Sequence, residues 1–264
     1  MRRKGADVKL ALWQARPTNG RIEPVFSSIR QNLVAASAAG AKLLLTPELI
    51  LPGYNRPDLH AALAQPLEGE WIQRLREMTR EAGCGLCFGW AERAGDLVYN
   101  AATTLGASGE ILAHYRKVQL YGAMEQASFA RGDSLCPIFE IEGRRAAMLV
   151  CYDIEFPQHA RALAQQGAEL ILVPTANPQG FEHVQWHLMP ARAHENDALV
   201  AYANLVGEEE GLVFGGLSLI AGPDGAALAQ AGARGESLLI VDLAAADAIS
   251  ADLRSHLAQE YRPL

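Results

Sequence analysis

The chain has 264 residues, half of them hydrophobic, and a formal net charge of −7. This is enough for a large hydrophobic core, and the acidic balance without a basic stripe argues against nucleic acid as a partner. The N-terminal residues are basic, but the apolar run from Leu10 to Trp13 is too short for a signal peptide or a membrane span. We therefore expect a cytoplasmic protein without a membrane segment, whose four cysteines are thiols.

Short apolar runs alternate with amphipathic helical patterns in the first half of the chain. Residues 8–14 have the composition of a buried strand, and residues 22–39 have helical spacing that ends at Gly40. Further strands are expected at 42–46, 85–92, 97–105 and 111–115, and a helix at 69–82. Residues 116–136 show no clear periodicity, and irregular stretches of this length are usually functional.

The second half repeats the alternation. Residues 137–141 and 146–150 predict a hairpin, and a helical pattern follows from Pro157 to Gly167. Strands are expected at 170–173, 198–204, 212–221, 226–229 and 237–243, with a helix at 186–196 and a short helical tail from residue 244. This order predicts an α/β protein with mixed sheets under outer helices. No linker divides the chain, so we expect a single domain over residues 1–264.

Cys151 directly follows the apolar run at 146–150 and precedes the helical pattern that begins at Pro157. It is therefore expected on a sharp strand-to-helix turn at the carboxyl end of a strand, where nucleophiles of α/β enzymes stand exposed. The alternative is one more buried structural thiol, because free cysteine is among the most buried residue types.

Two other chemically active side chains follow apolar strands: Glu48 and Lys117. A thiolate, a carboxylate that moves its proton and a cation near the oxyanion are the groups that amide hydrolysis through a thioester needs. The backbone N–H of Tyr152 would complete the oxyanion site. Taken alone, Glu48 could be a carboxylate at a helix start and Lys117 a solvated lysine.

Three segments resemble the signatures of the nitrilase superfamily of carbon–nitrogen hydrolases. They are LLLTPELILPGY at 43–54, HYRKVQLYG at 114–122 and MLVCYDIEFPQHAR at 148–161. The runs GAELILVPTAN at 167–177, RAHENDALVAYAN at 192–204 and GGLSLIAGPDG at 215–225 are also similar to family patterns. The resemblance covers nearly the whole chain.

The resemblance implies a catalytic triad of Glu48, Lys117 and Cys151 that uses no cofactor and no metal. It also implies a four-layer αββα sandwich that pairs into a homodimer or a higher homo-oligomer. A further family glutamate, eight residues after the lysine, corresponds to Glu125. It is expected to position the substrate and Lys117, the alternative being a solvated loop acid.

The runs CYDIEFP, GAELILVPTAN and RAHEN, with the tail ADLRSHL, are most similar to the aliphatic amidase branch. That branch includes 5-aminopentanamidase and stereoselective carboxamide amidases. Nitrilases typically carry Cys-Trp-Glu at the nucleophile, whereas this chain has Cys151-Tyr152-Asp153, which favours an amide over a nitrile. The resemblance thus implies hydrolysis of a small carboxamide; the alternatives are an N-carbamoyl-amine amidohydrolase, a nitrilase, or a silent binding protein on the same fold.

Other residues are assigned roles from their position in the sequence or from a short pattern. Tyr54, Tyr152, Asn177, Phe181 and Trp186 are candidates for positioning the substrate, with core packing an equal alternative for Trp186. A second set matches ligand or ion-pair patterns that we interpret as structural: Cys84 and Cys87 in a C-x-x-C, His183 and His187 at i, i+4, and Arg192 with Glu195.

Overall fold

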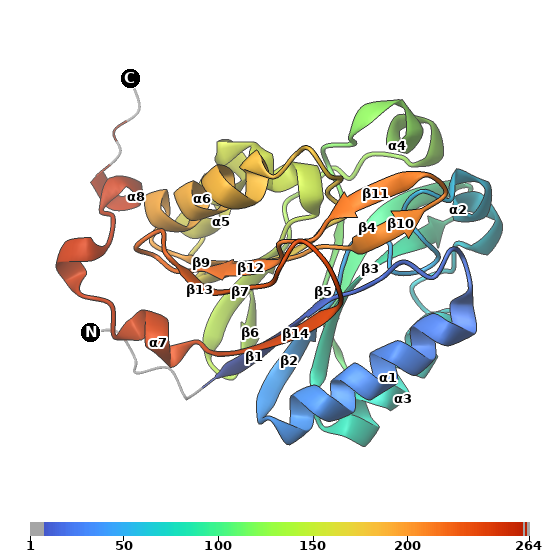
Figure 1. Ribbon diagram of the computed structural model, residues 1–264, viewed down its shortest axis with the longest axis horizontal. Helices are drawn as coiled ribbons and strands as arrows, with labels where there is room; N and C mark the ends of the chain where they lie inside the picture. The colour runs from blue at the N-terminus through green and yellow to red at the C-terminus, as the bar shows by residue number, and fades with distance from the viewer. Residues whose placement is uncertain (1–7, 261, 263–264) are drawn as a thin grey trace.

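Two six-stranded sheets lie face to face in the described part of the chain, which comprises residues 8–260 and 262 (Figure 1). The structure is a computed structural model, and the basic residues 1–7 considered above lie outside the described residues. The first sheet runs in the order β14 (Ser237–Asp242), β1 (Lys9–Gln14), β2 (Ala41–Leu45), β3 (Gly85–Ala94), β4 (Leu97–Leu105), β5 (Ile111–Arg116). The second runs in the order β13 (Ala227–Gln230), β12 (Leu219–Ala221), β9 (Leu199–Ala203), β8 (Leu170–Pro174), β7 (Arg144–Met148), β6 (Phe139–Ile141).

Helices cover the outer face of each sheet. Helices α1 (Ile22–Ala38) and α3 (Glu70–Ala82) pack on the first sheet, and α5 (Pro157–Gln165) and α6 (Met189–Glu195) cover the second (Figure 1). The remaining elements are short: α2 (Pro57–Leu63), α4 (Gly122–Ser128), α7 (Ala244–Asp247), α8 (Leu257–Glu260), 3₁₀-helices at Cys151–Glu155 and Ala251–Leu253, a π-helical turn at Val184–Leu188, and a hairpin of β10 (Val206–Glu209) and β11 (Leu212–Gly215). The expected αββα sandwich is confirmed.

Strand β1 shows why the layers form. Successive strand side chains point to opposite faces, and both faces of β1 are covered. Leu10 and Leu12 join the core between the two sheets, whereas Ala11 and Trp13 join the core under α1 and α3. This explains the continuous apolar run in the sequence, which is typical of a strand buried on both faces.

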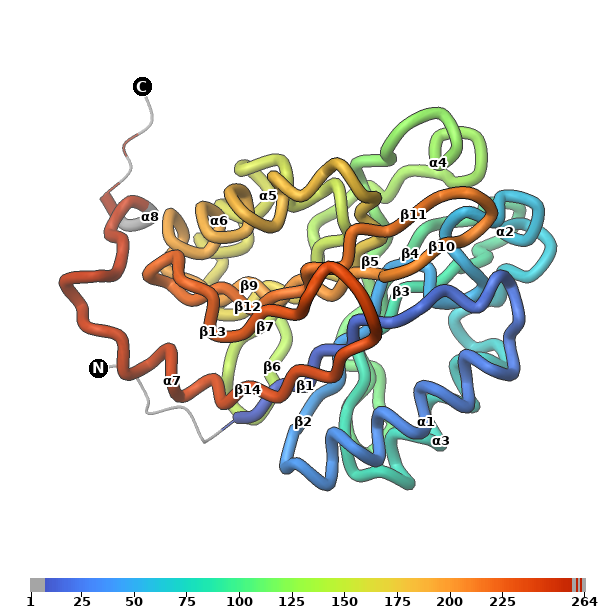
Figure 2. The backbone as a smooth tube through the Cα atoms, in the orientation of Figure 1, coloured from blue at the N-terminus to red at the C-terminus, as the bar shows by residue number. Residues whose placement is uncertain are grey.

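The first and last strands of the chain are neighbours in the first sheet. Strand β14 runs antiparallel beside β1, with Asp242 opposite Lys9 (Figure 2). Strands β1, β2 and β3 are parallel, as are β7, β8 and β9. Parallel neighbours need a crossover, which the outer helices supply. The carboxyl ends of these parallel strands therefore gather at one edge of each sheet.

Four local expectations are revised. The strand expected at 212–221 is two strands, because Gly216 and Leu217 have φ of 60° and 57° and turn the chain from β11 into β12. Helix α4 interrupts the stretch 116–136, which was expected to be irregular. Helix α2 and strand β10 were not expected. No helix in the described residues combines the length and the hydrophobicity needed to cross a membrane.

Candidate active site

Both sheets contribute to one buried site. Glu48 follows β2 and Lys117 follows β5, both in the first sheet, whereas Cys151 follows β7 in the second. Glu48 and Lys117 have no exposed surface, and Cys151 is 8% exposed. The charges of Glu48 and Lys117 both act on the Cys151 thiol. The facing edges of the two sheets thus bring together residues that lie up to about a hundred positions apart.

Lys117 lies between two carboxylates. Its Nζ is 2.7 Å from Glu48 Oε1 and 2.8 Å from Glu125 Oε1, and none of the three side chains is exposed. Burial by itself lowers the pKa of Lys117, but the negative charges of Glu48 and Glu125 outweigh burial, so its pKa lies well above the ordinary value. The ammonium is therefore charged throughout the physiological range.

Glu48 is held by one of its two oxygens. Oε1 accepts hydrogen bonds from Lys117 Nζ and from Asn100 Nδ2, each at 2.7 Å. Oε2 is buried and has no hydrogen-bond partner among the described residues. Burial raises the pKa of Glu48 to about 7 despite the opposing charge of Lys117. A carboxylate with this pKa and one free oxygen can accept and return a proton near neutral pH.

Glu125 has several donors around it. Tyr54 donates its phenolic hydrogen to Oε1 at 2.8 Å, in addition to the Lys117 contact, and the Tyr121 backbone N–H donates to Oε2 at 3.1 Å. Glu125 lies in the first turns of α4, whose N-cap is Tyr121. The structure therefore places Glu125 in the cluster and not on a solvated loop.

Cys151 begins the 3₁₀-helix that connects β7 to α5, and its φ is 44°. A left-handed conformation at a residue other than glycine is strained, and such strain is typical of nucleophiles on sharp strand-to-helix turns. The expectation that the thiol stands exposed is wrong, because both sheets and the preceding loops enclose it. Burial, with the charge of Glu48, raises the pKa of Cys151 well above its ordinary value. The resting group is a thiol that needs a base.

Thr175 connects the base to the nucleophile. It follows β8, and its carbonyl oxygen accepts the Glu48 backbone N–H at 3.3 Å. Its hydroxyl donates to the Tyr202 hydroxyl at 3.0 Å and interacts with the Cys151 sulfur, where it favours the thiolate. No role was predicted for Thr175 from the sequence, although polar residues directly after an apolar strand, as in PTAN at 174–177, indicate a candidate site.

Asp153 holds the nucleophile turn against the lysine segment. One carboxylate oxygen accepts the Val150 N–H at 3.1 Å and the Tyr115 hydroxyl at 2.8 Å; the other accepts the Gln119 N–H at 2.7 Å. The side chain is fully buried. Asp153 and Asn100 were both missed, because a polar residue inside a buried segment shows no role until its partner is known.

Aromatic side chains border the nucleophile turn. Tyr152 contacts Tyr121 edge to face with ring centroids 5.2 Å apart, and Tyr121 contacts Phe181 in the same way at 6.1 Å. Phe181 is 37% exposed, so this group reaches the surface. Trp186 is 57% exposed and therefore does not belong to the core. Its indole makes no aromatic contact with the described residues.

Asn177 organises the loop that carries Phe181. Its Nδ2 donates to the Phe181 carbonyl and to Gln185 Oε1, both at 3.0 Å. Its backbone N–H donates to Asn204 Oδ1 at 2.7 Å. The side-chain amide nitrogen is thus occupied by protein groups, and Asn177 shapes the aromatic wall through the loop backbone.

Two of the three patterns interpreted as structural, the Arg192 segment and the C-x-x-C, are found in structural settings. Arg192 donates to the carbonyl oxygens of Ile154 and Glu155, at 3.0 and 2.8 Å, and so ties α6 to the turn after Cys151. Cys84 and Cys87 are buried beside and within β3, and burial raises their pKa values to about 11 and about 12. Within the described residues, no group of three or more His, Cys, Asp or Glu side chains could hold a metal ion.

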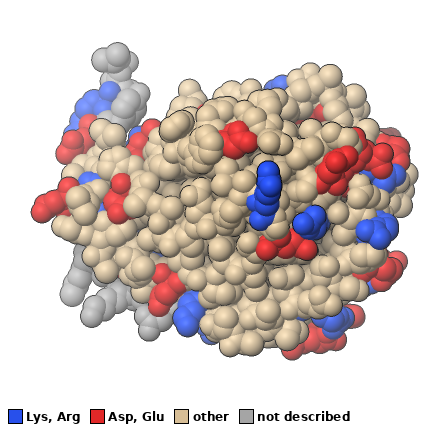
Figure 3. Space-filling view, in the orientation of Figure 1, with Lys and Arg blue, Asp and Glu red and all other residues tan. Residues whose placement is uncertain are grey.

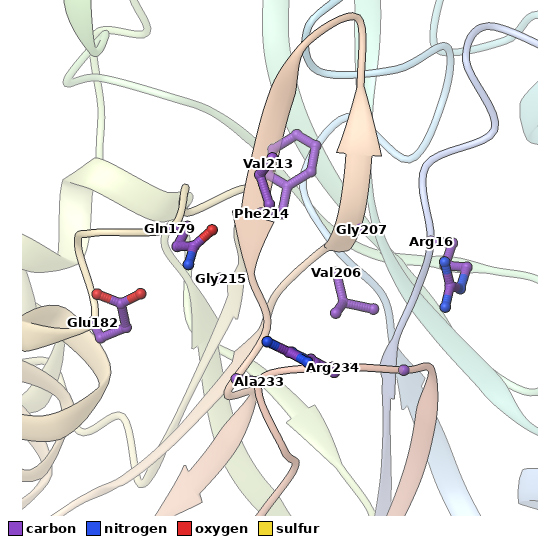
Figure 4. A pocket seen from close by; sticks show the side chains of 11 residues that line it. Arg16, Gln179, Glu182, Val206, Gly207, Val213, Phe214, Gly215, Ala233 and Arg234 are labelled. Carbon is purple, nitrogen blue, oxygen red and sulfur yellow. The ribbon is translucent and has the colours of Figure 1, made fainter.

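The surface is hollowed beside the loop that carries Phe181. A cavity of about 470 Å³ has Gln179 and Glu182 on one side, Arg16 on the other and Phe214 above (Figure 4). The Phe214 ring also contacts the Tyr54 ring edge to face, with the ring centroids 6.1 Å apart. On the face shown in Figure 3, acidic and basic side chains are scattered and intermixed.

Known proteins are similar along most of the chain. The family model described as carbon-nitrogen hydrolase matches residues 9–252. A protein of Pseudomonas protegens, described as a hydrolase in the pqqF 5′ region, is 40% identical and covers 85% of this chain and 79% of its own. An (R)-stereoselective amidase of Pseudomonas sp. is 35% identical, with 80% and 76% covered.

The amidase from Nesterenkonia sp. AN1, solved in complex with butyramide, has a TM-score of 0.88 and 36% identity over 98% of this chain and 96% of that chain. A variant of the same amidase carries the acetamide moiety of fluoroacetamide covalently at its active-site cysteine. The chain belongs to the carbon–nitrogen hydrolase family, the nitrilase superfamily that its glutamate, lysine and cysteine signatures resemble.

Proposed function

We propose that this protein, as a single domain, hydrolyses a small carboxamide to the carboxylic acid and ammonia. The observation that carries the proposal is the free, buried Oε2 of Glu48 in a cluster whose charges act on the Cys151 thiol. Known relatives support the proposal, since the Nesterenkonia amidase binds butyramide and reacts at a cysteine.

In the acylation step, Glu48 accepts the Cys151 proton while the sulfur attacks the amide carbon. The thiol needs this base because burial keeps its pKa high. The developing oxyanion is stabilised by the ammonium of Lys117 and by the N–H of Tyr152 near the start of the 3₁₀-helix, where N–H groups lack helical partners. Glu48 then returns the proton to the leaving nitrogen, and ammonia departs.

In the second step, Glu48 removes a proton from water, which attacks the thioester carbon. The C–S bond breaks, Cys151 recovers its proton, and the acid leaves. Glu125 and Tyr54 hold Lys117 in place through both steps, because Glu125 Oε1 contacts both. Tyr152 and Phe181, which both contact Tyr121 beside the nucleophile turn, favour the apolar part of a small substrate.

Ammonia release from a panel of amides, nitriles and N-carbamoyl amines tests the proposal. Small alkyl amides should be hydrolysed, and the acid should accumulate in step with ammonia. Carbon dioxide formed with the ammonia would identify an N-carbamoyl-amine amidohydrolase, and turnover of nitriles alone a nitrilase. No turnover across the panel, with Cys151 no more reactive than Cys84 toward fluoroacetamide, would indicate a binding protein on this fold.

We also propose that the protein is cytoplasmic and forms a homodimer through α5 and α6. All four cysteines are free, as expected in a reducing compartment. Exposed Trp186 lies in the π-helical turn that leads into α6, and a partner would cover it. Light scattering at micromolar concentration should give twice the monomer mass of 28.5 kDa. A monomer at that concentration would contradict this assembly.

A further inference from the structure

A buried carboxylate outside the proposed catalytic groups lies behind the site. Glu209, at the end of β10, has no exposed surface, although its neighbours Glu208 and Glu210 are exposed. Burial raises its pKa, against the lowering effect of the backbone N–H groups that face it. Burying an acid costs free energy unless hydrogen bonds offset the desolvation.

Glu209 holds the turn formed by residues 51–55. Its Oε2 accepts the Asn55 backbone N–H at 2.7 Å. In return, Asn55 Nδ2 donates to the carbonyl oxygens of Glu209 and Glu210, each at 3.1 Å. These bonds join the turn to the β10–β11 hairpin across more than 150 positions of sequence.

The fit between the carboxylate and the turn is close. Gly53 has a φ of 135°, and a Cβ built on it would lie 2.6 Å from Glu209 Oε1. Only glycine permits both this conformation and this approach. From the other side, the imidazole Nε2 of His60 lies 3.0 Å from the Gly53 carbonyl oxygen. The turn is therefore fixed between Glu209 and His60.

The turn carries Tyr54 into the catalytic cluster. The Tyr54 hydroxyl donates to Glu125 Oε1, the same oxygen that accepts from Lys117 Nζ. Phe214 of β11, seen on the hairpin in Figure 4, supports the Tyr54 ring from the hairpin side. One hairpin thus contacts both the backbone of the turn and the ring that the turn presents.

We propose that Glu209 is a positioning residue: by holding the 51–55 turn it places Tyr54, and through Tyr54 it places Glu125 and Lys117. This inference rests on the proposed amide hydrolysis. Oriented reactions lose rate steeply when a group moves, by ~10²-fold for a displacement of ~1 Å. Loss of the Glu209 contact should therefore lower kcat more than it raises KM.

A double-mutant cycle measured on kcat tests whether Glu209 acts through Tyr54. Glu209→Ala and Tyr54→Phe should each lower kcat by about 10- to 100-fold. The double variant should be no slower than the slower single variant, because both changes break the same chain of contacts. Losses that multiply, or wild-type kcat in Glu209→Ala, would overturn the proposal.

Two further variants separate positioning from stability. Glu209→Gln keeps an oxygen for the Asn55 N–H and should recover most of the rate, whereas Glu208→Ala, on the adjacent exposed acid, should match wild type. If Glu209→Ala does not fold, Glu209→Asp keeps the charge but draws the carboxylate back from the Asn55 N–H, and it must show the same non-additivity with Tyr54→Phe.

The wild-type assay distinguishes the two proposals. If the wild type hydrolyses amides but the losses of kcat in the two single variants multiply in the double variant, only the role of Glu209 is refuted. If the wild type turns over no amide, the proposed function fails, and the cycle is then measured on the rate at which iodoacetamide alkylates Cys151. That rate depends on the charge of Lys117 near the thiol and needs no substrate.

Discussion

Glu48 and Lys117 form a fully buried ion pair at 2.7 Å, in which Lys117 uses only one of the two carboxylate oxygens. The other oxygen, Oε2, stays free of protein donors among the described residues. The pair therefore does two things: it keeps Lys117 charged, and it leaves Glu48 able to move a proton.

Cys151→Ala should abolish ammonia release and leave the fold intact. No other described thiol lies in the cluster, and loss of one sulfur should change the free energy of unfolding by about 1 kcal/mol or less. Cys151→Ser should be nearly as inactive, because a hydroxyl is a much weaker nucleophile. Cys84→Ala, which removes another buried thiol, is the control and should retain full activity. Substantial turnover by Cys151→Ala would refute the thioester mechanism.

Lys117→Met keeps an aliphatic side chain but removes the charge at the oxyanion. We expect kcat to fall by at least ~10²-fold, as for loss of an oxyanion donor. Glu48 and Glu125 would also face each other without a counter-charge, so the free energy of unfolding should fall by about 3–5 kcal/mol.

The exposed Lys42 provides the control for Lys117→Met, because Lys42→Met removes a lysine of β2 and should alter neither quantity. Steady-state kinetics and urea unfolding measure the two effects. Near-normal kcat in a folded Lys117→Met protein would show that the oxyanion is stabilised elsewhere.

The strands and the nucleophile turn could be predicted because hydrophobic periodicity reports burial locally. The direct contact of Glu48 with Lys117 could not, since the two residues are 69 positions apart; their common place after apolar strands and the family resemblance predicted only that both belong to one site. Asn100 and Asp153 were missed for the same reason: their partners come from other strands. The break at Gly216 was hidden because apolar residues continue on both sides of it.

The pH dependence should report Glu48. Because its pKa is raised to about 7, kcat/KM should increase with pH and level off above that value, as the carboxylate becomes the active base. The raised pKa of Glu48 also affects the free energy of unfolding, which should fall as pH rises while kcat/KM increases. The contribution of protonated Glu48 is fully present below the ordinary pKa of 4.5 and is lost as pH rises through about 7.

Activity profiles and urea unfolding are measured from about pH 4, below the ordinary pKa of 4.5, to about pH 9, about 2 units above the raised pKa. Glu182→Gln, which changes an acid outside the cluster, should leave the profile unchanged. An acid limb of kcat/KM centred near 4.5 would mean that the base titrates as an ordinary carboxylate and that the pKa of Glu48 is not raised.

Glu125→Gln tests whether Lys117 needs its second carboxylate. Both Glu125 oxygens accept hydrogen bonds, Oε1 from Lys117 and Tyr54, and Oε2 from the Tyr121 N–H. A glutamine of the same size must point its NH₂ group at one of these donors. Whichever way the amide turns, a donor then faces a donor at a fully buried side chain.

We therefore expect two effects of Glu125→Gln. Acylation should slow by ~10²-fold or more because Lys117 shifts from its position. The free energy of unfolding should fall by about 1–3 kcal/mol, the usual cost of a buried unsatisfied group. Single-turnover formation of the acyl-enzyme measures the first, and denaturant unfolding the second. Asp133→Asn, on an exposed acid of the same 116–136 stretch, is the matched control. An acylation rate equal to that of the wild type, in a protein destabilised as expected, would reduce Glu125 to a structural partner and leave Glu48, Lys117 and Cys151 to carry the chemistry.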